Sequence, residues 1–438
     1  MLKRKIEKTL LDWKNNKDKK PLVIKGCRQC GKTSSVLKFA NENYKNVIYI
    51  NFIEHPEYKL LFADSLDVNE ITKKMSSLHN FKFSDNSHDT ILIFDEIQYC
   101  GNARTSLKFF KIDGRYDVIA TGSLLGVRGV GEEVVSIPVG FETNINMYPM
   151  DFEEFLWANG INDAVISDLK KKFENAEKID EATHKKFKQI LLSYIIVGGM
   201  PCAVDKYIKT NKYDEVLTIQ KDIISDYRDD VIKYTKNTDK IKILECFDSI
   251  TAQLSKENKK FQYSVVKKGR KARDYDGCIE WLINAGIVVK CNNLNALELP
   301  FDGNADKDCF KIYMQDIGLL IAMFEKGTQF DILSNNLYTY KGAIYENLAA
   351  DILSKMERKL YYYRKDSGLE IDFAIRYKNE CTPIEIKSNN EMAKSMRTVL
   401  KNENIYHIKN GIKFGDYNIG KDGKLLTAPL YAMFFLNE

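Results

Sequence analysis

The chain has 438 residues, more than one ordinary hydrophobic core supports, so about two to four domains are expected. Hydrophobic residues make up 44% and charged residues 29% of the chain, which favours a soluble globular protein and excludes a disordered one. The net charge of +5 is mildly basic and does not by itself indicate a nucleic-acid partner.

Signals of export and of membrane insertion are not expected from this sequence. The first residues are charged where a secretory segment would be hydrophobic. The longest apolar run, residues 190–204, is interrupted by Gly198, Gly199 and Pro201 and falls short of a membrane span. We therefore expect a cytoplasmic protein that does not associate with a membrane. The nine cysteines are irregularly spaced and are expected to be free thiols, and the five histidines show no metal-ligand spacing.

The first predicted elements are a helix at residues 6–13, a buried strand at residues 22–24 and a second helix around residues 36–40. The loop between the strand and the second helix, residues 26–33, reads G-C-R-Q-C-G-K-T. It matches the pattern G-x-x-x-x-G-K-[ST] of a phosphate-binding loop, and the order of strand, loop and helix is the one that this motif requires. The alternative is an ordinary turn before a helix, with no ligand.

The positions of this loop have predicted roles in holding ATP and Mg²⁺. The two glycines let the backbone curl so that successive N–H groups point at the phosphates. Lys32 would place its charge on the β- and γ-phosphates, and Thr33 would offer its hydroxyl to Mg²⁺. The expected nucleotide-binding residues are Gly26, Cys27, Arg28, Gln29, Cys30, Gly31, Lys32 and Thr33. We interpret the C-x-x-C pair in the loop as a coincidence, because a redox or metal role would require the loop to give up its nucleotide.

An acidic pair, Asp95 and Glu96, follows a predicted strand at residues 91–94. Open α/β sheets bind ligands at the carboxyl ends of their strands. Asp95 would hold Mg²⁺, directly or through water, and Glu96 would polarise the attacking water. The alternative is that the two residues only cap the next helix.

Further strands are predicted at residues 46–52, 116–120 and 134–139. A strand between the loop and the acidic strand, with a glutamate beside the aspartate, is the arrangement of the additional-strand P-loop ATPases. In that class the strand after the acidic one ends in a polar residue that senses the γ-phosphate. Ser123 is the first candidate and Thr121 the second, and the alternative for Ser123 is an ordinary helix cap.

The middle of the chain is predicted to be mainly helical. Residues 163–234 suggest a small helical lid over the nucleotide, with a sharp turn at residues 198–201. Residues 241–291 suggest a winged helix, and its basic septet, residues 267–273, would suit phosphate contacts on DNA. The alternatives for the septet are a solvated turn or contacts to the nucleotide of a neighbouring subunit. Turn-rich residues 291–295 and 302–306 are expected to bracket a linker.

The last part of the chain contains a second candidate site. Asp372 lies in one predicted strand, and Glu385 and Lys387 share one face of the next. Asp372 and Glu385 could bind a divalent metal, with Lys387 assisting the attacking water, and Glu346 on a preceding helix could point at the same place. This is the D…(D/E)-x-K layout of nucleases. The alternative is a nuclease-like domain that has lost activity or serves for docking.

Together these motifs resemble, over nearly the whole chain, the prokaryotic AAA-superfamily ATPases that carry a C-terminal DUF4143 domain. The resemblance rests on residues 21–33, 90–98, 121–126, 136–140, 152–155, 197–201, 252–258, 340–343, 368–373 and 383–388. It implies an α/β fold with an additional-strand P-loop NTPase core at residues 1–160 and a helical lid at 161–235. A winged-helix region at 236–300 and an α/β restriction-endonuclease-like domain at 305–438 would follow.

Two classes of function stay open at this stage. The first is an ATP-dependent enzyme acting on nucleic acid, with the C-terminal site cutting it. The second is an ATP-dependent switch or interaction protein whose C-terminal domain only binds a partner and does not need the acidic residues. In both, ATP and Mg²⁺ are the expected cofactors, and DNA and a second copy of the chain are candidate partners. Arg115 and Arg128 are candidates for an arginine finger.

Overall fold

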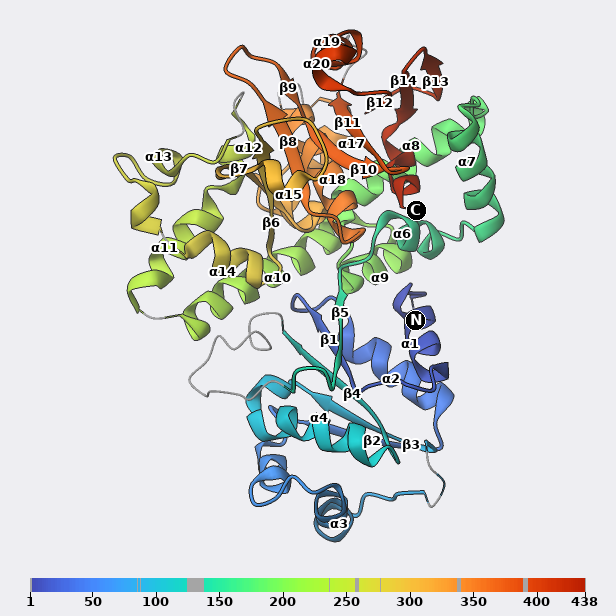
Figure 1. The fold of residues 1–438 in the computed structure, drawn as a ribbon, viewed down its shortest axis with the longest axis vertical. Coiled ribbons are helices and arrows are strands. Elements are labelled where there is room, and N and C mark those ends of the chain that lie inside the picture. Colours follow the sequence, from blue (N-terminus) through green and yellow to red (C-terminus); the bar gives the residue numbers. More distant parts are fainter. Residues whose placement is uncertain are drawn as a thin grey trace. The chain divides into compact units, whose positions relative to one another are not determined.

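The computed structural model describes residues 2–84, 86, 88–123, 138–235, 237–256, 260–275, 277–336, 340–388 and 393–437 (Figure 1). The chain divides into two compact units. Unit 1 comprises Met1–Pro149 and Asn284–Gly286, and unit 2 comprises Met150–Ile283 and Ile287–Glu438. The finer division of unit 2 into lid, winged-helix region and C-terminal domain stays a prediction. No helix in the described ranges has the length and apolar character that crossing a membrane would need.

Unit 1 is an α/β unit around one parallel sheet with the strand order β2-β3-β4-β1-β5. Strand β4 therefore lies between β1 and β3, whereas the predicted strand at residues 46–52 is β2 at the edge of the sheet. The predicted α/β core is confirmed, and the additional-strand class stays a prediction. The elements are α1 Ile6–Asn15, β1 Leu22–Gly26, α2 Lys32–Asn43, β2 Asn46–Asn51, η1 Pro56–Phe62, α3 Val68–His79, β3 Thr90–Asp95, η2 Ile97–Tyr99, α4 Gly101–Asp113, β4 Asp117–Ser123 and β5 Thr143–Met147.

The sheet of unit 1 has a hydrophobic core on each face. Successive residues of a strand point to opposite faces, so Phe94 and Val118 pack with η1, α3 and α4, whereas Ile93 and Ile119 pack with α1 and α2. Figure 1 shows the strands of this unit between α2 and α4. Covering both faces buries the parallel strands, which explains their continuous apolar sequences.

The last strand of unit 1 differs from the expectation. The predicted strand at residues 134–139 lies mostly outside the described residues, and the observed strand β5 is Thr143–Met147. Its sequence, T-N-I-N-M, has few apolar residues because β5 is an edge strand and pairs only with β1 in this sheet as described. A search for apolar runs therefore overlooks it.

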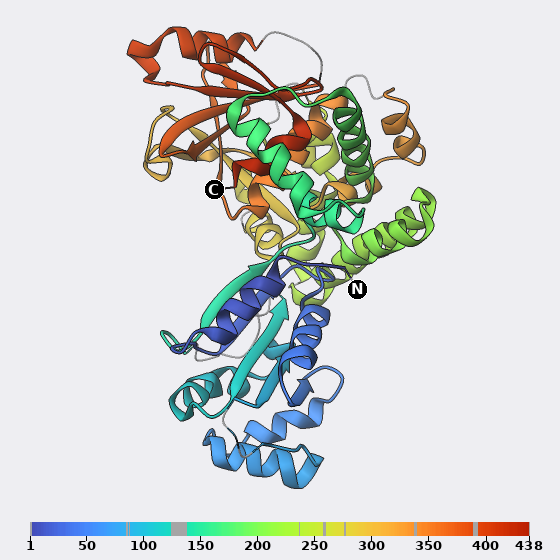
Figure 2. The ribbon, with the colours of Figure 1, turned by 90° about the vertical axis from the view of Figure 1, so that its right-hand side faces the viewer.

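Unit 2 begins with helices, as the sequence predicts (Figure 2). Asp151 caps the first of them in a capping box with Glu154. The turn at residues 198–201 separates α8 from α9, and a Cβ on Gly199 would lie 1.9 Å from the Met150 carbonyl oxygen. The helices are α6 Phe152–Ala158, α7 Asp163–Asn175, α8 Glu181–Val197, α9 Pro201–Thr210, α10 Tyr213–Tyr234, α11 Asn237–Asp248, α12 Ile250–Leu254, α13 Tyr263–Val266, η3 Ala272–Tyr275 and α14 Cys278–Asn284.

The rest of unit 2 contains two mixed sheets, with the orders β7-β6-β8-β9 and β10-β11-β12-β14-β13. In the second sheet β10 and β11 are antiparallel, whereas β11 and β12 are parallel. The elements are β6 Val288–Leu294, α15 Phe301–Asn304, β7 Ala305–Met314, α16 Ile317–Ala322, α17 Thr328–Leu333, α18 Tyr340–Lys355, β8 Leu360–Arg364, β9 Glu370–Ile371, β10 Phe373–Tyr377, β11 Glu380–Lys387, α19 Lys394–Lys401, α20 Glu403–Tyr406, β12 Gly411–Gly415, β13 Gly420–Asp422, β14 Leu425–Pro429 and η4 Leu430–Leu436.

The first of the two turn-rich stretches that were expected to bracket a linker, residues 291–295, is mostly strand. Cys291, Asn292 and Asn293 continue β6, which pairs with β7 on one side and β8 on the other. The amide side chain of Asn293 accepts a hydrogen bond of 2.9 Å from the Arg364 backbone N–H. Pairing on both sides thus outweighs the low strand propensity of asparagine.

Candidate functional site

The loop between β1 and α2 uses its two glycines for different reasons. Gly31, which precedes α2, has a φ of 95°, a left-handed conformation that favours glycine. A Cβ on Gly26 would lie 2.3 Å from the Met147 carbonyl oxygen and 2.8 Å from Cys30 Sγ, so no larger residue fits there. The first glycine therefore permits close packing, and the second permits the turn into the helix.

The side chain of Lys32 is folded back into the loop. Its Nζ donates to the carbonyl oxygens of Gly26 at 3.1 Å and Cys27 at 2.8 Å, and the residue is 8% exposed. The ammonium group is therefore held at the centre of the predicted phosphate cradle. Because α2 begins at Lys32, the positive end of the helix dipole acts at the same place.

Asp95 at the end of β3 contacts the end of the loop. Its Oδ2 accepts hydrogen bonds from the Thr33 hydroxyl at 3.0 Å and from the Tyr49 hydroxyl at 2.7 Å. Its Oδ1 accepts from the Thr121 hydroxyl and, at 3.1 Å, from the Glu96 backbone N–H. The structure thus places the two predicted Mg²⁺ ligands side by side, and the carboxylate is 3% exposed.

Tyr49 is a residue that the sequence analysis missed. It lies on β2, opposite Ile93 in the neighbouring strand β3, and its hydroxyl also accepts a hydrogen bond of 3.1 Å from the Asn51 side chain. Burial, and then the bond to Asp95, raise the pKa of Tyr49, so the phenol stays a donor at neutral pH. The sequence did contain a signal for this role: a residue with a polar group, Tyr49, in an apolar strand next to the acidic strand.

The other predicted residues of this site are also located. Glu96 has a φ of 54°, and its carboxylate accepts a hydrogen bond of 2.5 Å from the Gln98 side chain. Ser123 is the last residue of β4 and pairs in register with Gly26, whereas Thr121 is fully buried against Asp95. Arg115 pairs with Asp113 at 2.7 Å before β4 begins. Arg128 lies outside the described residues.

The C-terminal candidate residues lie on adjacent strands. Lys387 Nζ pairs with Glu385 Oε1 at 2.7 Å on β11, as expected for two residues on the same face. Asp372 directly precedes β10, and its Oδ2 accepts a hydrogen bond of 2.7 Å from the Ile386 backbone N–H. The antiparallel pairing of β10 and β11 therefore brings Asp372 beside the Glu385 strand.

Glu346 pairs with a lysine that the sequence did not single out. It lies on α18 and pairs at 2.9 Å with Lys311 of β7, which also pairs at 2.8 Å with Glu370. The Tyr313 hydroxyl also donates to Glu346. Although burial alone would lower it, the charges of Glu346, Glu370 and Asp372 raise the pKa of Lys311, so Asp372 acts on the same lysine as Glu346. A buried lysine thus already neutralises the carboxylate of Glu346.

Two further residues face Glu385. Lys413 on β12 is its partner in the parallel ladder, and Lys413 Nζ lies 4.6 Å from the centre of the Tyr417 ring. Burial lowers the pKa of Lys413, against the opposing charge of Glu385. Glu385 Oε2 and the Tyr417 hydroxyl are both buried, and neither makes a hydrogen bond in the described structure. Among the described residues, no group of three or more His, Cys, Asp or Glu side chains is placed to hold a metal.

The basic septet forms the turn between α13 and η3. Lys267 pairs with Glu245 of α11 at 2.8 Å, and Gly269 has a φ of 82° that allows the turn. The rings of Tyr263 and Tyr275 on either side are stacked, with centroids 6.0 Å apart. Lys268, Arg270, Lys271 and Arg273 are exposed. The septet is therefore a solvated turn fixed at its base, with charges available for a partner.

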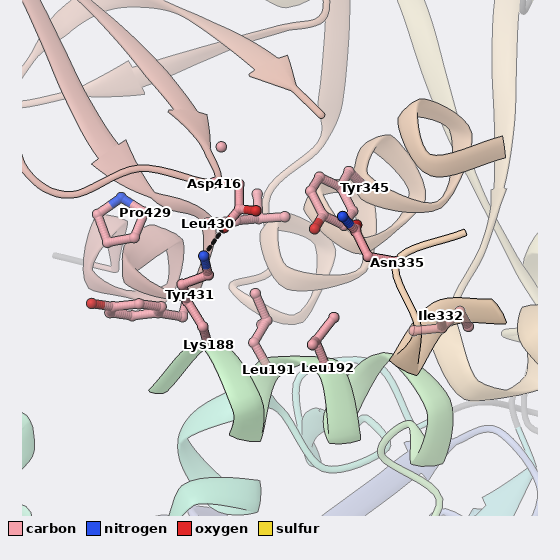
Figure 3. A pocket seen from close by; sticks show the side chains of 11 residues that line it. Lys188, Leu191, Leu192, Ile332, Asn335, Tyr345, Asp416, Pro429, Leu430 and Tyr431 are labelled. Carbon is pink, nitrogen blue, oxygen red and sulfur yellow. Dashed lines mark ion pairs between the residues drawn. The ribbon is translucent and has the colours of Figure 1, made fainter. Parts of the chain in front are cut away.

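Unit 2 also contains a cavity of about 240 Å³ between α8, α17, α18 and the segments at residues 415–416 and 429–431 (Figure 3). Leu191 and Leu192 form an apolar wall, and Lys188 pairs with Asp416 at 2.5 Å across it. None of the predicted site residues lines this cavity.

Three family models match the chain. Residues 18–156 match a model described as an AAA domain, and residues 341–431 match a domain of unknown function, DUF4143. Residues 188–329 match a second domain of unknown function, DUF8612, which the sequence analysis did not anticipate. The AAA match covers the P-loop and the acidic strand, and the DUF4143 match covers Asp372, Glu385 and Lys387.

A curated relative and several solved structures are similar to parts of the chain. An uncharacterized protein of Haemophilus influenzae is 26% identical over 148 residues, which are 32% of this chain and 34% of that protein. The match thus spans about a third of the relative. A Walker-type ATPase of Pyrococcus abyssi aligns with a TM-score of 0.42 and 15% identity, over 74% of this chain and 96% of its own.

Two other structures match with lower scores. The Aeropyrum pernix ORC2 protein, solved with ADPNP and ADP, has a TM-score of 0.32 and 14% identity, over 76% of this chain and 91% of its own. The Thermotoga maritima RuvB Holliday junction branch migration motor has a TM-score of 0.28 and 13% identity, over 66% and 89%. From the family models and the P-loop geometry, we conclude that the chain carries an AAA-type P-loop domain followed by a DUF4143 segment.

Proposed function

We propose that unit 1 binds ATP with Mg²⁺ and hydrolyses it. The observation that carries this proposal is the hydrogen bond of 3.0 Å between Thr33 and Asp95, because it joins the end of the phosphate loop to the end of the acidic strand. Hydroxyl and carboxylate oxygens are the ligands that Mg²⁺ prefers, so the donor set fits this ion. The AAA match over residues 18–156 supports the same function.

The residues have separate roles in this mechanism. Lys32 is already held inside the loop, so the triphosphate would replace the carbonyl oxygens of Gly26 and Cys27 as its partners. Thr33 and Asp95 would hold Mg²⁺, which neutralises phosphate charge when bound. Glu96 accepts a hydrogen bond from the Gln98 side chain at its Oε2 and would orient the attacking water. Ser123, beside Gly26, would contact the γ-phosphate.

The test compares two variants in binding and in turnover. Lys32→Ala should lose ATP binding, whereas Glu96→Gln should keep binding and lose on the order of 10²–10⁴-fold in hydrolysis rate. Chelation of Mg²⁺ with EDTA should stop hydrolysis by the wild-type protein. Wild-type turnover in Glu96→Gln would refute the role of Glu96, and unchanged ATP affinity in Lys32→Ala would refute the site.

We propose as a second function that the C-terminal domain acts on nucleic acid with a divalent metal. Glu385 Oε2 supports this, because a buried carboxylate oxygen without a partner is costly unless a cation or donor binds it. The strands β10, β11 and β12, in antiparallel and then parallel pairing after helix α18, are also consistent with a nuclease-like domain. When bound between Asp372 and Glu385, the metal would supply a polarised water, and Lys387 would orient that water.

The alternative is a domain that only binds a partner, and one observation favours it. Glu346 is held by the buried Lys311, so this carboxylate needs no metal to be neutralised. A nuclease assay on single-stranded and double-stranded DNA, with Mg²⁺ or Mn²⁺ and with or without ATP, separates the two. Metal-dependent cleavage that Asp372→Ala abolishes supports the enzyme. Binding without cleavage under all of these conditions supports the interaction protein.

A further inference from the structure

The phosphate loop contains two cysteines whose side chains meet. Arg28 and Gln29 form a turn, with Cys27 and Cys30 at its two ends. Both cysteines are buried, and their side chains are hydrogen-bonded to each other. The ends of such a turn lie within about 7 Å, which is the Cα separation that a disulfide can span. The spacing of this pair suggests a coincidence, whereas its chemical surroundings indicate a reactive pair.

Two cations act on Cys30. Lys32 Nζ lies 4.0 Å from Cys30 Sγ, and Arg4 Nη1 donates to the Cys30 carbonyl oxygen at 2.9 Å. Arg4 also donates to the Tyr148 carbonyl oxygen at 2.8 Å, which fixes its position. The hydrogen bond with Cys27, together with these charges, lowers the pKa of Cys30 to about 6, although burial opposes the shift. The thiolate is the reactive form of cysteine, and the contact with Cys27 and the two cations favour this form of Cys30.

A metal site fits the cysteine pair less well than redox chemistry does. It would need more ligands, and no cluster of three or more His, Cys, Asp or Glu side chains occurs in the part of the chain that the structure describes. A second cysteine pair, Cys246 and Cys278 in unit 2, is also hydrogen-bonded, but the charge acting on Cys246 is the anion Glu245. In the described structure no cation acts on Cys246, so this pair serves as an internal comparison.

We propose that Cys27 and Cys30 are a redox pair that a hydroperoxide converts to a disulfide, and that the disulfide closes the loop to ATP. Cys30 thiolate attacks one oxygen of hydrogen peroxide and becomes a sulfenic acid, while the O–O bond breaks and the other oxygen leaves as hydroxide, which takes the proton that Cys30 released to solvent and becomes water. The Cys27 sulfur then attacks the Cys30 sulfur and releases a second water. Two thiols and one hydrogen peroxide thus give one disulfide and two water molecules. A dithiol reductant reverses the change.

The effect on ATP follows from the position of the pair. A disulfide holds its two sulfur atoms at about 2.05 Å, much closer than a hydrogen bond does, so the ends of the turn must approach. The Gly26 backbone packs against Cys30 Sγ and leaves little room to adjust. The N–H groups of this turn would bind the phosphates, and each hydrogen bond to a charged group is worth a factor of about ten or more. Displacement of these N–H groups should weaken ATP binding. This effect should be larger than the gain from removing the negative charge of the Cys30 thiolate, which repels the phosphates.

This inference rests on the proposed ATP binding, and the test separates the two. ATP affinity is measured on the full chain after reduction with dithiothreitol and after treatment with hydrogen peroxide. Mass spectrometry of the peptide that contains both cysteines detects the loss of two hydrogens. We expect a disulfide between Cys27 and Cys30, at least about tenfold weaker ATP binding, and recovery on reduction. Failure of the reduced protein to bind ATP would refute the proposed function and the inference together.

Variants of single cysteines test whether the change in ATP affinity depends on the disulfide between Cys27 and Cys30. Cys30→Ser, which removes the attacking thiolate, should show the same ATP affinity before and after peroxide, whatever that affinity is. Cys27→Ser can reach only the sulfenic acid at Cys30 and should form no disulfide in this loop. Cys246→Ser, which removes the comparison pair, should keep the full response, and so should a variant of the exposed Cys202. Reduced protein that binds ATP but forms no disulfide between Cys27 and Cys30 would overturn the inference alone. So would a disulfide that leaves the affinity unchanged or raises it, or a response that persists in Cys30→Ser.

Discussion

Replacement of Tyr49 by phenylalanine tests whether β2 contributes to the metal end of the ATP site. The change removes one hydroxyl and keeps the ring, so the hydrogen bond of 2.7 Å to Asp95 is the main loss. A hydrogen bond to a charged group is worth about 1.5–3 kcal/mol. Asp95 keeps its bonds from Thr33, Thr121 and the Glu96 backbone, so we expect the lower end of this range. A loss of about 1.4 kcal/mol corresponds to a factor of about ten.

The expected result is a shift in the Mg²⁺ dependence of ATP hydrolysis. The Mg²⁺ concentration at half-maximal rate should rise about tenfold in Tyr49→Phe, while the rate at saturating Mg²⁺ changes little, because Tyr49 orients Asp95 and does not touch the reacting atoms. Tyr116→Phe is the matched control, since it removes a hydroxyl from the same unit before β4 begins. An unchanged Mg²⁺ dependence would refute the positioning role. A tighter Mg²⁺ dependence would show instead that Tyr49 competes with the ion.

Two other predictions concern unit 2. Gly199→Ala should destabilise the protein by about 3 kcal/mol or more, because the new Cβ would lie 1.9 Å from the Met150 carbonyl oxygen. Chemical unfolding measures this change. Gly303→Ala is the control: its new Cβ meets no atom within 4 Å, so stability should change by less than about 0.5 kcal/mol. If the basic septet binds DNA, alanine at Lys267, Lys268, Arg270 and Lys271 should weaken binding and lower the slope of log affinity against log salt by about 0.9 or less per lost contact. An unchanged slope would place the DNA contacts elsewhere.

The ATP site could be predicted from sequence because its parts are short and contiguous. Eight adjacent residues specify the loop, and two specify the acidic end of β3. Local chemistry explains both, since a tight loop needs glycine and a buried strand needs apolar residues. The hydrogen bond between Thr33 and Asp95 joins the loop to the acidic strand. This contact follows from the parallel sheet, because the carboxyl ends of β1 and β3 lie on the same side.

Residues whose role depends on a distant partner could not be predicted. Tyr49 and Lys311 lie on strands that show no motif, and each acts on a carboxylate more than thirty positions away. Asn292 and Asn293 suggested a linker, but β7 and β8 pair with them on both sides. Strand pairing of this kind depends on tertiary packing, so the strand propensity of a short stretch of sequence gives the wrong prediction.

The partners of Glu346 and Glu385 make the C-terminal site testable. Both carboxylates are buried and both pair with a lysine, Glu346 with the buried Lys311 at 2.9 Å and Glu385 Oε1 with the partly exposed Lys387 at 2.7 Å. The second oxygen of Glu385, Oε2, has no hydrogen-bond partner in the described structure. A metal that used Glu346 would have to displace a buried ammonium group, which would leave that charge unpaired at a large cost. A metal at Glu385 would instead bind a buried oxygen, Oε2, that has no hydrogen-bond partner in the described structure. We therefore predict that Glu385, with Asp372, dominates metal affinity and that Glu346 does not contribute to it.

Calorimetric titration with Mn²⁺ in the absence of nucleotide measures this difference. Glu385→Gln should weaken Mn²⁺ binding at least about tenfold, as the loss of a ligand does, and Asp372→Ala should do the same while ATP hydrolysis by unit 1 continues. Glu346→Gln should change the affinity less than about twofold, because Lys311 rather than the ion is its partner. Equal losses in Glu346→Gln and Glu385→Gln would refute the assignment. Absence of Mn²⁺ binding in the wild-type chain would leave Lys311 as the cation of this site and make the domain a binding module.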